Sequence, residues 1–339
     1  MAKINSSVAW KSPSNIAIVK YWGKKETQIP MNPSLSFTLQ NCCTETKIEY
    51  SEGDGKIQFL YDGKERPDFL PKIEKFFELI QLPFLKELDL RIHSKNNFPH
   101  SAGIASSASS MSALSLCITE IEQKHYNPSI NFLQAASLRS RLGSGSASRS
   151  VYNTASLWGK TLESEDSSDN YAIDWSKNIH SEFMDVQDWI FLVNQKEKSV
   201  SSTDGHDLMH NHPYKMQRIE QAINNISYVI KALKNGDWES FISVCEEEAL
   251  SLHALMMSSR PGYLLLEPDS VRLVHSIQKF RNETKLPVCF TIDAGPNIHL
   301  LFPKKIEEQV NAWIQLVFPE YISGNNIIKD CMGKGPEKI

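Results

Sequence analysis

The spacing of apolar residues changes along the chain, from alternation in the first part to a helical repeat later. Alternating apolar and polar residues at 44–50 and 56–61, separated by the turn residues 53–55, predict an antiparallel β-hairpin. The alternation through 15–19 predicts another strand. Further strands are expected at 88–93, 189–194, 288–292 and 298–302.

Between these strands, apolar residues recur every three to four positions, as they do in amphipathic helices. We expect helices at 69–80, 111–122, 130–142, 214–234, 237–258, 268–281 and 305–317. The acidic segment 163–170 is expected to be a surface loop, and the tail GKGPEKI a frayed end. This mixture predicts an α+β fold rather than a doubly wound sheet, with two lobes at 1–188 and 189–339.

The composition is that of an ordinary globular protein. Of 339 residues, 41% are apolar and 22% charged, and a net charge of −4 gives no general attraction for nucleic acid or an anionic membrane. The sequence has no apolar run of membrane-spanning length and no signal-peptide pattern at its start. Six cysteines without CxxC spacing predict free thiols in a reducing compartment, so we expect a cytoplasmic protein.

A serine-rich segment, NFPHSAGIASSASS at 97–110, precedes the helix expected at 111–122. Small residues let the backbone approach a ligand closely, and Gly103 can adopt torsion angles that other residues avoid. Backbone N–H groups, serine hydroxyls and the positive end of the helix dipole would together bind polyphosphate. The alternative is a serine-rich cap on a buried helix.

Two other segments also combine hydroxyls with cations. GSGSASRS at 143–150 carries Arg149, whose guanidinium can bind phosphate through two hydrogen bonds, although a flexible turn is an equal alternative. SVSSTD at 199–204 lies beside Lys196 and Lys198, and it suits either an anion or a polar linker between lobes.

The segment NIAIVKYWGKK places two lysines beside two aromatic residues and a glycine, in the order Lys20, Tyr21, Trp22, Gly23 and Lys24. The lysines would attract a phosphorylated substrate, and the tyrosine hydroxyl would donate a hydrogen bond. Solvated lysines at the end of a strand are the alternative.

FTIDAGPN brings Asp293 from an apolar strand directly into an Ala-Gly-Pro turn. A carboxylate held among small residues suits a general base or a metal ligand, although aspartate also commonly opens turns. A histidine cluster, His206, His210 and His212, is the other metal candidate, but Pro213 limits a helix there and we expect no metal site.

Taken together, the anion-binding segments, the lysine pair and one fixed aspartate indicate phosphoryl transfer, which depends mainly on positioning and charge neutralisation. In the same order, these strings resemble the diphosphomevalonate decarboxylase family, part of the GHMP kinase superfamily of galactokinase, homoserine kinase and mevalonate kinase. The resemblance covers about residues 10–302 and includes IPMNPSLSFTL. It implies a two-lobed GHMP-kinase-like fold, with a ribosomal protein S5 domain 2-like N-terminal lobe and a ferredoxin-like C-terminal lobe.

The resemblance also implies a reaction: ATP with Mg²⁺ phosphorylates the 3-hydroxyl of 5-diphosphomevalonate, and loss of phosphate and CO₂ gives isopentenyl diphosphate. Asp293 would be the catalytic carboxylate, with Lys20 beside it and the transferred phosphate. The implied substrate-binding residues are Tyr21, Trp22, Lys24, Ser144, Ser146, Arg149, Ser202 and Thr203. The implied ATP-binding residues are Asn97, Ser101, Ala102, Gly103, Ala105, Ser106 and Ser107. Members of this family are commonly homodimers, so a homodimer is expected.

The sequence departs from the family pattern in a few places. His206 stands where methionine follows SSTDG, Ser148 replaces the cysteine before Arg149, and Ser101 and Ser110 replace smaller residues. The changes after SSTDG lie near the expected cleft and bear on which mevalonate derivative is bound. The alternatives are a relative acting on 5-phosphomevalonate, a 3-kinase that does not decarboxylate, and a non-catalytic ligand sensor.

Overall fold

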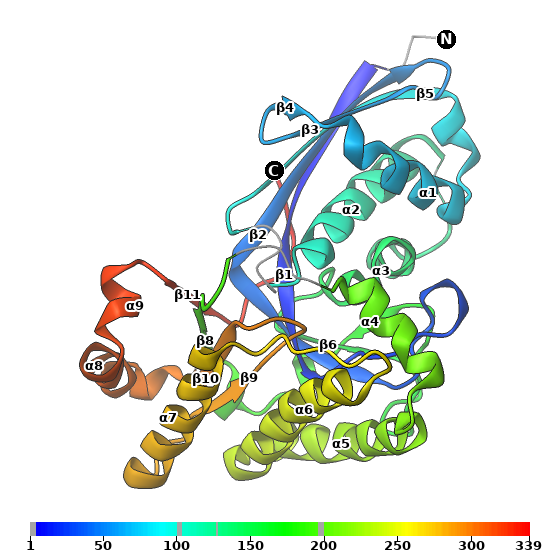
Figure 1. The fold of residues 1–339 in the computed structure, drawn as a ribbon. Helices are drawn as coiled ribbons and strands as arrows, with labels where there is room; N and C mark the ends of the chain where they lie inside the picture. The colour runs from blue at the N-terminus through cyan, green and yellow to red at the C-terminus, as the bar shows by residue number, and fades with distance from the viewer. Residues whose placement is uncertain (1–4, 100–103, 127, 196–199) are drawn as a thin grey trace.

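The structure is a computed structural model that describes residues 5–99, 104–126, 128–195 and 200–339. Its larger sheet is formed by β1 Asn5–Val19, β2 Ser34–Glu52, β3 Ile57–Tyr61, β4 Lys64–Glu65, β5 Leu88–Asn96, β6 Ala155–Trp158, β7 Ala172–Asp174 and β12 Glu337–Lys338. The strands lie in the order β12-β1-β2-β5-β3-β4, and β6 pairs with β2 and with β7. The long antiparallel strands β1 and β2 run through the length of this sheet (Figure 1).

The predicted hairpin of 44–50 with 56–61 is wrong. Both segments are strands, but β5 lies between β2 and β3, and β3 pairs with β5 in parallel. The antiparallel ladder between β2 and β5 runs from Thr44 opposite Asn96 to Glu52 opposite Leu88. Alternation shows that a strand has one buried face, but it does not identify the strand's partner. The partner of β2 is therefore β5, which lies farther along the chain, and not the segment 56–61 that the turn at 53–55 had suggested.

Three helices lie on one side of β1 and β2: α1 Leu70–Ile80, α2 Ser106–Tyr126 and α3 Phe132–Gly143 (Figure 1). The helices predicted at 69–80, 111–122 and 130–142 are thereby confirmed, although α2 begins earlier. Its first turns bury Ser109 and Ser112 beside the apolar Ala108 and Met111. Ser109 bonds to Thr44 at 2.6 Å, and Ser12 donates to Ser112 at 2.7 Å. These hydroxyl contacts let a polar segment pack against the sheet.

The second sheet is antiparallel, and its strands lie in the order β11-β8-β10-β9. Its elements are β8 Val186–Phe191, β9 Cys289–Thr291, β10 Ile298–Pro303 and β11 Ile327–Cys331, with α7 Pro268–Thr284, α8 Glu307–Val317 and α9 Pro319–Ser323 packed nearby. The strands predicted at 189–194, 288–292 and 298–302 are confirmed within a few residues. The mixed helix and sheet architecture predicted from the sequence is also confirmed.

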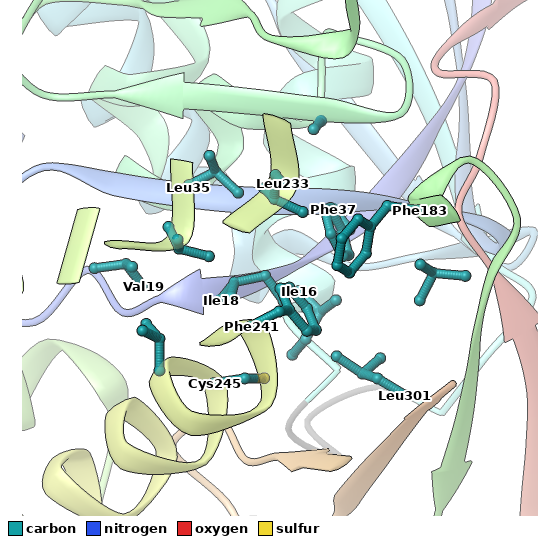
Figure 2. Packing of buried hydrophobic residues seen from close by; sticks show 14 of the residues in the cluster. Ile16, Ile18, Val19, Leu35, Phe37, Phe183, Leu233, Phe241, Cys245 and Leu301 are labelled. Atoms are coloured by element: carbon teal, nitrogen blue, oxygen red, sulfur yellow. The ribbon is translucent and has the colours of Figure 1, made fainter. Parts of the chain in front are cut away.

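One apolar core joins the two sheets. The remaining helices are α4 Ser202–Leu208, α5 Lys215–Asn235 and α6 Trp238–Ser258. Figure 2 shows Ile16 and Phe37 of the first sheet packed with Phe241 of α6, and Leu301 of β10 belongs to the same buried cluster. The proposed division between 188 and 189 falls inside β8 and stays a prediction.

The expectation of a frayed tail is wrong, because residues 337–338 form β12 on the edge of β1. Trp10 pairs with Lys338 and Lys11 with Glu337 in this short ladder. The ammonium of Lys338 lies 2.7 Å from a carboxylate oxygen of Glu120 on α2. In the ranges given above, no helix has both the length and the apolar character needed to cross a membrane.

Candidate active site

A cavity of about 500 Å³ opens where the end of β1, the start of α2, the loop after α3, α4 and the turn after β9 meet. Many of the residues singled out in the sequence line it: Lys20, Tyr21, Trp22, Lys24, Ala105, Ser106, Ser107, Ser144, Ser146, Arg149, Thr203 and Asp293. Of the described residues in its wall, three lysines and one arginine carry positive charge, whereas only Asp293 is a carboxylate. The cavity therefore suits an anionic ligand.

Lys20 and Asp293 form an ion pair in this cavity, with 2.8 Å between Nζ and Oδ1. The side chain of Lys20 is 2% exposed and that of Asp293 is 23% exposed, so the carboxylate is the more exposed member of the pair. Lys20 directly follows β1, and Asp293 follows β9. His253 on α6 contacts the carbonyl oxygen of Asp293 at 3.1 Å, which helps to hold the turn.

A second ion pair, Arg218 with Glu248, holds the backbone of Lys20. Glu248 accepts the N–H of Lys20 at 2.8 Å, and Arg218 donates to its carbonyl at 3.0 Å. Asn32 donates to the same carbonyl at 3.0 Å. Because the polar groups of Lys20's own backbone are all engaged, the position of its side chain is tightly defined.

Arg149 is buried in the wall of the cavity and is 2% exposed. Its guanidinium donates to Oγ of Ser34 and, at 3.3 Å, to Oδ1 of Asn15. Burial lowers the pKa of Arg149 to about 10, although the negative charge of Asp293 opposes this shift. It is therefore still a cation at neutral pH. Since the two acceptors are neutral oxygens, its charge remains available to attract an anion.

The two serine-containing loops meet at one end of the cavity. Oγ of Ser107, at the start of α2, lies 3.3 Å from Oγ of Ser144, which lies 3.4 Å from that of Ser146. A Cβ on Gly145 would come within 2.7 Å of the Tyr21 ring, so only glycine allows this loop to approach the aromatic wall. Burial raises the pKa of Tyr21, which keeps its hydroxyl a neutral donor.

Comparison with known proteins decides the family. The family model described as "Diphosphomevalonate decarboxylase-like N-terminal domain" matches residues 12–169. The family model described as "Mevalonate 5-diphosphate decarboxylase C-terminal domain" matches residues 189–337. Diphosphomevalonate decarboxylase mvd1 of Aspergillus fumigatus is 30% identical over 330 residues, which cover 90% of this chain and 79% of that protein. The chain belongs to the diphosphomevalonate decarboxylase family.

Solved structures of mevalonate diphosphate decarboxylases have the same fold. The Staphylococcus aureus enzyme is 30% identical, with a TM-score of 0.87 over 99% of this chain and 98% of that one. A structure of MDDEF in complex with MVAPP, AMPPCP and magnesium is 27% identical, with a TM-score of 0.85 over 100% of this chain and 99% of that one. The two-lobed GHMP-kinase-like α+β fold predicted for this family member is confirmed.

Some predicted site residues of this decarboxylase-family chain do not line the cavity or cannot be placed. Asn97 lies elsewhere, where it donates to the carbonyl of Asn41 at 2.7 Å and accepts the N–H of Cys43 at 2.8 Å. Ser101, Ala102, Gly103, Lys196 and Lys198 lie outside the described residues, as does the side chain of Ser202. Trp22 is largely packed against Leu252 and its neighbours, so it forms a wall more than a ligand contact.

Other cavity residues of this family member were not predicted to bind ligand. Lys72 comes from α1, and burial lowers its pKa. No signal in the sequence marked it, because the helix periodicity assigns it to the polar face. His206 had been considered with His210 and His212 as a metal cluster. Among the residues that the structure places, no group of three such side chains could hold a metal ion.

Proposed function

We propose that this chain catalyses the ATP-dependent decarboxylation of (R)-5-diphosphomevalonate to isopentenyl diphosphate, ADP, phosphate and CO₂, in the mevalonate pathway of isoprenoid biosynthesis. The observation that carries the proposal is the Lys20–Asp293 ion pair, 2.8 Å long, inside a cavity with four cationic side chains. Membership of the diphosphomevalonate decarboxylase family supports the same reaction.

Asp293 would act on the substrate's 3-hydroxyl. A tertiary alcohol is crowded and weakly nucleophilic, so a fixed carboxylate that orients it and accepts its proton assists attack on the γ-phosphorus. The O–P bond forms as the bond to ADP breaks. Departure of the 3-phosphate then builds positive charge at carbon 3, which the nearby carboxylate would stabilise. Loss of CO₂ leaves its bonding electrons in the new double bond.

Lys20 would serve the same step from the other side of the pair. Its ammonium would neutralise charge at the transferred phosphate, and it contacts the carboxylate of Asp293 directly at 2.8 Å. Because its backbone is fixed by Glu248 and Arg218, this geometry exists before the substrate binds. Such preorganisation avoids a reorganisation cost during the reaction.

The residues at the start of α2 fit the phosphates of a nucleotide. Ala105, Ser106 and Ser107 lie in the cavity wall at the positive end of a helix of 21 residues, and Lys72 faces the same space. ATP-binding roles are proposed for them and for Ser101, Ala102 and Gly103, but no longer for Asn97, whose amide is engaged by Asn41 and Cys43 away from the cavity. Mg²⁺ bound with the nucleotide would supply charge neutralisation, as is consistent with the AMPPCP and magnesium in the MDDEF complex.

The other cationic and hydroxyl groups would hold the second substrate. We assign the diphosphate and carboxylate of the mevalonate derivative to Tyr21, Lys24, Ser144, Ser146 and Arg149. Ser202, Thr203 and Trp22 would line the same cleft. The sequence resemblance and the shared cavity support these roles. A homodimer and a cytoplasmic location stay predictions, and sedimentation of the purified protein would test the first.

The test is an ATP-coupled assay that measures ADP and CO₂ together, with 5-diphosphomevalonate and 5-phosphomevalonate side by side. We expect equal release of both products from the diphosphate alone. Preference for the monophosphate would make the chain a phosphomevalonate decarboxylase. ADP without CO₂ would indicate a 3-kinase. Binding of both ligands without turnover would indicate a sensor and overturn the proposal.

A further inference from the structure

His206 occupies an unusual position in the wall of the cavity. It lies on α4, and its ring centre is 4.4 Å from that of Tyr21 and 4.7 Å from that of Trp22. The backbone N–H of Gly23 donates to its Nδ1 at 3.0 Å. The imidazole is therefore held on three sides by the loop that also carries Lys24, at the proposed phosphate end of the substrate site.

These contacts define which nitrogen carries the proton. Since Nδ1 accepts a hydrogen bond, the neutral ring must bear its hydrogen on Nε2. Burial, together with the charges of Lys24 and Arg149, lowers the pKa of His206 to about 3, so the ring is neutral near pH 7. An imidazolium here would add a further cation to a site that already holds Lys24 and Arg149.

The Nε2–H group is available to a ligand. Within the described part of the chain, only the Gly23 contact engages the polar atoms of this ring. Nε2 is not one of the polar atoms that are both buried and without a partner. Because His206 lines the cavity, a ligand there can reach this nitrogen. A neutral donor beside cations is a geometry that suits phosphate, because it adds a directed hydrogen bond without adding repulsion between the cations.

We propose that His206 is a specificity-determining residue whose Nε2–H donates to the phosphate group at carbon 5 of the substrate. This inference rests on the proposed function, because it assigns the anion attracted by Lys24 to that phosphate. A methionine at this position would fill similar space without either polar contact. His206 would therefore contribute one directed hydrogen bond to the binding of the phosphorylated end of the substrate.

Three substitutions separate this role from a merely structural one. His206→Met removes both polar contacts. His206→Asn keeps an acceptor near the position of Nδ1 for the N–H of Gly23 but does not reach as far as Nε2. His206→Gln extends a donor toward the position of Nε2 and gives up the contact with Gly23. A donor role thus predicts that Gln restores function better than Asn, whereas a role in holding the loop predicts the reverse order.

The experiment measures KM and kcat for 5-diphosphomevalonate, and KM for ATP, in the full-length protein and the three variants. We expect His206→Met and His206→Asn to raise the substrate KM about ten- to a hundred-fold, as for loss of a hydrogen bond to a charged group. His206→Gln should stay within about threefold of the unmodified protein, and KM for ATP should be unchanged in all three.

An unchanged substrate KM in His206→Met, or a better Asn variant than Gln variant, would overturn the inference while leaving the proposed function intact. Equal increases in the KM values for substrate and ATP would also overturn it, because they indicate general damage to the site. If the unmodified protein releases neither ADP nor CO₂, the proposed function fails, and the inference fails with it.

Discussion

Arg218 on α5 and Glu248 on α6 form an ion pair with two parallel hydrogen bonds of 2.7 Å, and each also binds the backbone of Lys20. Their side chains are 1% and 0% exposed. Asn225 donates a further hydrogen bond of 2.8 Å to Glu248. The pair thus connects two helices of the later half of the chain to the residue that faces Asp293.

Removing one member of this pair should cost both stability and activity. Glu248→Ala leaves the charge of Arg218 buried without its carboxylate, so the free energy of unfolding should fall by about 3–5 kcal/mol. The turnover number should also fall, because the backbone of Lys20 loses a contact that positions it. Urea unfolding followed by tryptophan fluorescence, with steady-state kinetics, measures both effects.

The matched control is Glu283→Ala, which breaks an exposed pair with Lys279 on α7. Exposed pairs contribute little, so this variant should change the free energy of unfolding by less than about 1 kcal/mol. If Glu248→Ala is no less stable than the control, the Arg218–Glu248 ion pair that holds the backbone of Lys20 does not contribute to the free energy of unfolding.

Asp293→Asn tests the proposed base. The amide keeps the shape of the side chain but cannot accept the proton of the 3-hydroxyl, so kcat should fall by about 10²–10⁴-fold. ATP should bind as before, as measured by fluorescence titration or calorimetry. Asp166→Asn, in an exposed loop, is the control. Unchanged turnover in Asp293→Asn would exclude this residue as the base.

Arg149→Ala tests the proposed anion site. Loss of a buried charged contact should weaken binding of the diphosphate substrate by about 2–5 kcal/mol, seen as a higher Kd or KM. Arg149→Lys should restore only part of this loss, because a lysine cannot form the two parallel hydrogen bonds of a guanidinium. Arg66→Ala removes an exposed arginine that pairs with Asp68 and should leave the substrate KM unchanged. A negligible effect of Arg149→Ala would contradict its assigned contact.

The depressed pKa of His206 predicts how stability depends on pH. The value is about 3 in the folded protein, against 6.5 for an ordinary histidine. Between these values the unfolded chain binds a proton that the folded chain does not. The contribution of the neutral His206 to the free energy of unfolding is therefore fully present above pH 6.5. It is lost as the pH falls toward 3, by about 1.4 kcal/mol per pH unit.

This dependence can be isolated with His206→Met. The difference in free energy of unfolding between the unmodified protein and this variant should change with pH between 6 and 4, in favour of the variant at low pH. His275→Asn, at an exposed position on α7, is the matched control variant. Parallel pH curves for the unmodified protein and His206→Met would mean that the histidine is protonated normally in the fold.

Periodicity in the sequence predicted most of the helices and strands, but not how the strands pair. The segment at 56–61 was correctly assigned as a strand, and yet its partner β5 lies on the far side of α1 in the sequence. Pairing depends on long-range packing, which alternation does not encode. The strand length was also underestimated where residues 34–39 are buried on both faces and show no alternation.

The cavity was more predictable than the sheet, because its residues lie in short strings of unusual composition. Lys20, Arg149 and Asp293 were each marked by neighbouring glycines, serines or a turn, and the structure brings them together. The supporting residues were not predictable in this way. Arg218 and Glu248 lie within ordinary amphipathic helices, and only the fold shows that they meet at the backbone of Lys20.

The pairing of β12 with β1 has a consequence for how the molecule is made. A strand near the beginning of the chain gains its outer neighbour only after residues 337–338 have been synthesised. Until they emerge from the ribosome, the edge of β1 near Trp10 is open to other strands. The nascent chain therefore passes through a stage in which its first sheet is unprotected.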